Sequence, residues 1–83
     1  MNSVLFDKLR EDTINAFREF LTNEFREINS KDDGMQFVDD MIMLFTRELS
    51  IQFAAFIAGD RKTQVELRKI AYSKFNDLTV SRN

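Results

Sequence analysis

The sequence of 83 residues contains no Cys, His, Pro or Trp, and its formal net charge is −2. The absence of Cys excludes a disulfide scaffold, and the absence of His removes the commonest general base and metal ligand. A chain of this length predicts a single domain, 1–83, in which the nine Phe residues supply much of the core.

No stretch of the sequence has the pattern of a signal peptide or a membrane-spanning helix. Charged residues interrupt the N-terminal region from Asp7 onward. The longest uncharged apolar run, residues 49–59, is about half as long as the ~20 residues that a spanning helix needs. We therefore expect a cytoplasmic protein.

The first predicted helix covers about residues 3–28. Apolar side chains recur at three- and four-residue spacings from Leu5 to Ile28, which predicts an amphipathic helix. Charged residues occupy the opposite side, as on an ordinary solvent-facing helix surface. We assign no function to these charges.

A polar cluster at residues 29–34 predicts the first turn. Asn29 suits the end of the first helix, and Asp33, with Gln36 three residues later, resembles a capping box for the next helix. A calcium loop is the alternative interpretation. The cluster lacks the alternating ligand spacing and the Glu at the twelfth position of such a loop, so we expect no metal.

A very apolar stretch, residues 35–58, predicts the central helix. Its apolar positions cover an arc of about 200°, whereas a surface helix needs a stripe of about 100°. Glu48 and Gln52 divide this arc into two faces. The first face, expected to form the core, holds Val38, Ile42, Phe45, Leu49, Phe53 and Phe56. The second face, expected to bind another protein chain, holds Phe37, Met41, Leu44, Ile51 and Ala55.

Two interpretations of the second face stay open. Three helices in a chain this short rarely wrap so wide an apolar face, so we expect the face to contact a partner or a second copy of the chain. In the alternative, the first and third helices cover both faces and the protein is a monomer. Glu48 either contributes specificity at the partner-binding face or extends its carboxylate to solvent between the two faces.

The third predicted helix covers about residues 63–78, followed by a frayed tail at residues 79–83. Thr63 and Glu66 form a capping box, which leaves Arg61 and Lys62 outside the helix. There the two residues lie near the C-terminus of the preceding helix, where positive charge is stabilising. The alternative cap, Asp60, places both basic residues in a first turn that disfavours positive charge.

Basic residues gather in this C-terminal part of the chain. Arg61, Lys62, Arg68 and Lys69 form a candidate contact for a polyanion, and the alternative function is therefore a small nucleic-acid-associated regulator. The negative net charge and the absence of a recognition-helix signature argue against nucleic acid. An acidic partner protein, or the acidic first helix of a second copy, explains the same charges.

Together these elements predict an all-α fold. Two arrangements fit: a small three-helix bundle, or a helical hairpin plus a short third helix. In either arrangement, a second copy of the chain can complete the core by dimerisation. The carboxylates are scattered over solvent-facing helix sides, and no Gly-rich phosphate loop is present. We expect no enzyme activity and no cofactor. The predicted function is a homo-oligomeric regulatory protein that acts by helix-mediated protein–protein binding without inserting into a membrane.

The whole chain also resembles a known family. In its size, its helical composition without His, Cys or Pro, and its opening MNSVLFDKLREDTINAFREFLTNEFREI, it is similar to the rIII lysis-inhibition accessory proteins of T4-like bacteriophages. The resemblance implies a cytoplasmic phage protein whose partner is the cytoplasmic N-terminal part of the phage holin. Such binding delays the formation of membrane holes and postpones lysis. The resemblance assigns no individual contact residue.

Overall fold

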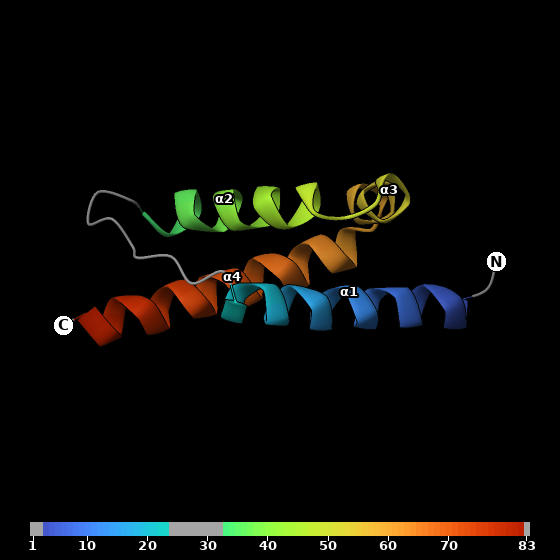
Figure 1. Cartoon of the computed structure of the whole chain (residues 1–83). Coiled ribbons are helices and arrows are strands. Elements are labelled where there is room, and N and C mark those ends of the chain that lie inside the picture. Colours follow the sequence, from blue (N-terminus) through green and yellow to red (C-terminus); the bar gives the residue numbers. More distant parts are fainter. Residues whose placement is uncertain (1–2, 24–32, 83) are drawn as a thin grey trace.

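Four helices make up the described part of the molecule (Figure 1). The computed structural model describes residues 3–23 and 33–82. The helices are α1 (Ser3–Asn23), α2 (Gly34–Arg47), α3 (Ile51–Gly59) and α4 (Arg61–Arg82). No strand occurs among these residues, so the predicted all-α fold class is confirmed.

Three of the helices run along the long axis of a molecule that measures 48 × 20 × 20 Å between Cα atoms (Figure 1). α1 and α4 run in one direction and α2 runs in the other, whereas α3 lies across this axis at the end where α1 begins. α4 contacts all three other helices. The predicted count of three helices is therefore corrected to four, with three long helices in an up-down-up order.

The start of α2 follows the sequence prediction. Asp33 has an extended backbone, and its carboxylate accepts a hydrogen bond of 2.8 Å from the backbone N–H of Gln36. This is the expected N-cap. The predicted end of the first helix at Ile28, and most of the polar turn with Asn29, lie outside the described residues.

The prediction of one continuous central helix over residues 35–58 is wrong. The chain leaves the helical path between Arg47 and Ile51. Glu48 lies seven residues after Met41 and three after Phe45, so a continuous helix would turn its carboxylate toward the core side. The break leaves Glu48 exposed instead.

Ser50 starts the next helix. Its hydroxyl accepts a hydrogen bond of 3.3 Å from the backbone N–H of Phe53, and its carbonyl accepts one of 2.9 Å from that of Ala54. A Ser at this position stabilises a helix by about 1 kcal/mol relative to Ala. The helix therefore breaks after Arg47 for two reasons: Glu48 carries a charge that is unfavourable in the core, and Ser50 is a good N-cap for a new helix.

The predicted boundaries of the last helix are also wrong. Asp60, rather than Thr63, caps α4: its carboxylate accepts hydrogen bonds from the backbone N–H and the hydroxyl of Thr63. Its carbonyl accepts the first helical hydrogen bond, from Gln64, at 3.1 Å. The helix continues to Arg82, so residues 79–82 are helical and not a frayed tail.

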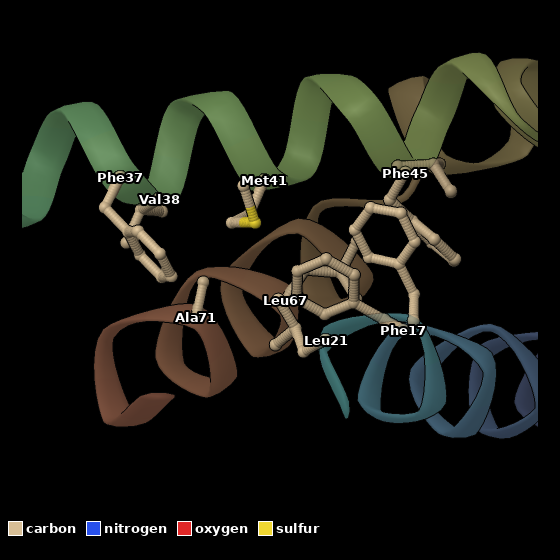
Figure 2. Packing of buried hydrophobic residues seen from close by; sticks show 10 residues of the cluster. Phe17, Leu21, Phe37, Val38, Met41, Phe45, Leu67 and Ala71 are labelled. Atoms are coloured by element: carbon tan, nitrogen blue, oxygen red, sulfur yellow. The ribbon is translucent and has the colours of Figure 1, made fainter. Parts of the chain in front are cut away.

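The core lies where α4 packs beside α1 and α2 (Figure 2). The Phe45 ring lies 5.0 Å from that of Phe17 and 5.5 Å from that of Phe20, and Phe37 lies 5.6 Å from Phe75, between ring centroids. The buried apolar residues are Phe17, Phe20, Leu21, Phe37, Val38, Met41, Phe45, Ile57, Leu67 and Ala71. Nine of these ten belong to the three long helices, so α3 contributes little to the core.

Candidate protein-binding surface around helix α3

α3 is the most apolar of the four described helices, yet it is poorly covered. Gln52 is its only polar residue, and Ile57 is its only fully buried one, at 5% exposure. Ile51 is 88% exposed and Phe53 is 36% exposed. A contiguous exposed apolar surface often marks a site of interaction with another molecule.

One flank of α3 faces the start of α1. The rings of Phe6 and Phe56 stack there, with centroids 6.2 Å apart and planes 10° from parallel. A cleft of about 480 Å³ lies beside them, which we call the α1–α3 cleft. Its lining consists of Phe6, Asp7, Arg10, Phe56, Gly59, Asp60 and Lys62.

An ion pair fixes this end of the molecule. Arg10 Nε donates to Asp60 Oδ2 at 2.9 Å and a terminal nitrogen of Arg10 donates to Asp60 Oδ1 at 3.2 Å, while its other terminal nitrogen donates to Asp7 at 2.9 Å. The hydrogen bond from Arg10, followed by that from Thr63, lowers the pKa of the Asp60 carboxyl to about 2. Asp60 is therefore ionised at neutral pH and joins α1 to the α3–α4 junction.

The other flank of α3 borders a second hollow, of about 320 Å³, which we call the α2–α3–α4 groove. Its lining consists of Ile42, Thr46, Ala54, Ile57, Ala58, Gln64, Leu67 and Arg68. Ile51 shares this side of the helix with Ala54 and Ala58, because the three residues are spaced by three and four. The Gln64 amide closes one end by donating to the carbonyls of Ile57 and Ala58, at 2.9 Å each.

Phe37 and Met41, predicted to bind a partner, are buried in the core, so this part of the predicted partner-binding face is wrong (Figure 2). The spacing of four residues places both on the same side of α2 as Phe45, and α4 covers that side. The remaining predicted residues stay at the surface to different extents. Leu44 is partly buried against the core, whereas Glu48, Ile51 and Ala55 are exposed.

The face predicted to form the core also divides at the break. Val38 and Phe45 on α2 are buried as expected, whereas Phe53 on α3 is at the surface. Ile42, Leu49 and Phe56 are partly buried and pack against the core. The two predicted faces therefore do not persist along the stretch, because α2 and α3 point in different directions.

The predicted polyanion contact is partly neutralised by the chain itself. Arg68 donates to Asp39 at 2.9 Å, and the Lys69 ammonium lies 3.6 Å from the Glu66 carboxylate. Arg61 and Lys62 are exposed in the first turn of α4. The geometry thus offers two solvent-facing cations next to α3 rather than a continuous basic stripe.

Sequence reasoning missed the α1–α3 cleft and the pair between Arg10 and Asp60. Fifty residues separate the two ionic partners, and no local pattern signals a pair at that distance. The break before α3 did leave a signal: Glu48 falls on the core side of α2, and Ser50 is a strong N-cap residue.

Among the residues that the structure describes, no group of three or more His, Cys, Asp or Glu side chains is placed to hold a metal ion. Within the same residues, no helix combines the length and the apolar character needed to span a membrane. Comparison of the chain with protein-family models, with curated proteins and with solved structures found no match. The surface around α3 is therefore the feature of the described residues that bears most on function.

Proposed function

We propose that the protein is a non-catalytic regulator that binds another protein through the α1–α3 cleft. The observation that supports this function is the stack of the exposed Phe6 ring on the partly buried Phe56 ring, beside an open cleft that both residues line. Aromatic side chains beside a cleft are typical anchors of protein–protein interfaces.

The charges around the cleft favour a partner protein over a small apolar ligand. Asp7 and Lys62 line the cleft together with the two rings, and both are exposed. An apolar centre with polar groups of both signs at its edge is the usual composition of a reversible interface. The occupant that fits is a helical segment with one or two large apolar side chains and flanking charges.

The most specific form of this proposal comes from the resemblance to the phage lysis-inhibition accessory proteins. In that form the occupant is the cytoplasmic N-terminal segment of a T4-type holin. Binding would hold back holin molecules from forming membrane holes and would postpone lysis of an infected bacterium.

The test is titration of the full chain with a synthetic peptide of the holin's cytoplasmic N-terminal segment, followed by calorimetry. We expect saturable binding, and a loss of at least about tenfold in affinity for Phe6→Glu, because a buried charge would face the apolar anchor. The matched control is Tyr72→Glu. Tyr72 and Phe6 are both aromatic and both 37% exposed, and Tyr72 lies on α4 outside the cleft lining.

Each result of this titration has a separate meaning. No binding by the wild-type chain would overturn the holin form of the proposal. Equal binding by wild type and Phe6→Glu would overturn the assignment of the cleft. A circular dichroism spectrum of each variant, recorded before titration, shows that the helices are intact.

A further inference from the structure

Ile51 and the α2–α3–α4 groove lie on the same side of α3, and both are open to solvent. Ile51 is an exposed large aliphatic side chain at the first position of α3, and the groove is an apolar hollow on the same side of that helix. In an interface with two-fold symmetry, one chain offers both parts and each contact is made twice.

We propose that a second copy of this chain covers the groove. The α3 helices of the two copies pack antiparallel about a two-fold axis, with Ile51 of each copy lying over Ala58 of the other. The small side chains of Ala54, Ala55 and Ala58 allow the two helix axes to approach closely. In the described chain Ala55 and Ala58 are exposed and Ala54 lines the groove, so none of them is committed to the core.

The charges at the ends of α3 select the second copy and its direction. Glu48, just before α3, and Arg61, just after it, are both exposed, whereas Lys62 lines the α1–α3 cleft and takes no part in this contact. Antiparallel packing brings Glu48 of each copy to Arg61 of the other, whereas parallel packing would bring like charges together. Of the other charges nearby, Arg47 is exposed in the last turn of α2, next to Glu48, and Asp60 is already paired with Arg10.

The contact is small, so we expect a reversible dimer. Nine residues of α3 span about 14 Å at 1.5 Å per residue. Interfaces that bury less than about 1,200 Å² in total are weak and transient, so we expect association at high protein concentration and dissociation on dilution.

The dimer contact goes beyond the proposed function, because it uses the opposite flank of α3 from the α1–α3 cleft. Both clefts of the dimer stay open. A partner that is itself oligomeric would meet two clefts at once, and its apparent affinity would rise through effective concentration.

The first test is sedimentation equilibrium of the full chain from micromolar to millimolar concentration. We expect a mass that rises from monomer to dimer and stops there, and at least a tenfold weaker association for Ile51→Glu. The control is Met35→Glu, which adds the same charge at another exposed apolar residue, 60% exposed, at the far end of α2. A strictly monomeric wild type, growth beyond the dimer, or unchanged association of Ile51→Glu would each overturn the proposal.

The second test exchanges the charges at the helix ends. Glu48→Arg and Arg61→Glu should each weaken the dimer several-fold, and the double variant should recover most of the loss. Losses that add in the double variant, or single variants without effect, would overturn the antiparallel packing. Ile51→Glu should keep peptide binding in the α1–α3 cleft, and Phe6→Glu should keep dimerisation, so a failure of this inference and a failure of the proposed function are told apart.

Discussion

α2 and α3 come from one apolar stretch of sequence, and the structure treats them in opposite ways. α2 lies along α4 and buries four residues, Phe37, Val38, Met41 and Phe45. α3 is the more apolar of the two but lies across the end of the molecule, where only Ile57 is fully buried. The apolar character of a helix therefore does not by itself determine its burial. The direction of the helix decides whether the rest of this chain can pack against it.

The comparison also separates two kinds of apolar residue. A buried apolar residue of α2, such as Phe45, contributes to folding, because residues of α1 and α4 pack around it. A residue such as Ile51 adds little to folding, because water surrounds most of its side chain in the single chain. Its contribution is expected only when another molecule covers it.

The largest expected effect contrasts one Phe from each helix. Phe45→Ala should lower the free energy of unfolding by about 3–5 kcal/mol, because it removes contacts with Phe17 and Phe20 and leaves a cavity. Phe53→Ala, the matched substitution on α3, should cost about 1 kcal/mol or less, since over a third of that side chain is already exposed. Urea unfolding at a concentration that keeps the chain monomeric measures both values. Similar losses for the two variants would show that α3 belongs to the core as fully as α2 does.

The next effect concerns the ion pair that holds α1 to the α3–α4 junction. Asp60→Ala removes the N-cap of α4 and should lower the free energy of unfolding by about 1–2 kcal/mol. Asp60→Asn should lose less stability than Asp60→Ala, because its amide oxygen still accepts the hydrogen bond from the Thr63 N–H. It should still be less stable than the wild type, because the charge that attracts Arg10 is gone.

The pH dependence of this effect has a defined sign. The pKa of Asp60 falls from 3.8 to about 2 on folding, so the ionised carboxylate stabilises the folded chain above about pH 4. That stabilisation is lost as the pH falls from about 4 to about 2, and the difference between wild type and Asp60→Asn should shrink over the same interval. A difference that stays constant down to pH 2 would contradict the ionic contribution of Arg10.

Sequence reasoning succeeded where structure is set by local signals. The Asp33 cap and the buried spacing of Val38 and Phe45 depend on residues three to seven positions apart, and both are confirmed. The prediction of a continuous helix through residues 47–51 is wrong, because the hydrophobic pattern of the whole run does not contain the local N-cap signal of Ser50. The positions of Arg61 and Lys62 favour Thr63 over the alternative cap, Asp60. Arg10, which stabilises the Asp60 carboxylate, lies fifty residues away and gives no local signal.

A smaller effect tests the cap that separates α3 from α2. Ser50→Ala removes the hydroxyl that accepts from Phe53 and should lower the free energy of unfolding by about 1 kcal/mol. Ser50→Asp should retain stability, because a carboxylate accepts the same hydrogen bond and suits the positive end of the helix dipole. Urea unfolding of the two variants distinguishes capping from a mere change of side-chain size. Equal losses in both would mean that the break does not depend on this cap.

The smallest expected effect contrasts the ion pairs on the two sides of α3. Arg68 and Asp39 join α4 to α2 at the edge of the α2–α3–α4 groove, with side chains 43% and 53% exposed. Solvent and salt screen such a pair, so a double-mutant cycle with Arg68→Ala and Asp39→Ala should give a coupling of a few tenths of a kcal/mol that vanishes in high salt. The pair of Arg10 and Asp60 is less exposed and shares Asp60 with the cap of α4, so its coupling should be larger and should persist in salt. A stronger coupling for the Arg68 pair would mean that charge at the groove edge holds α2 against α4. The apolar packing of Phe37 and Met41 would then not be enough to explain why α2 is buried and α3 is not.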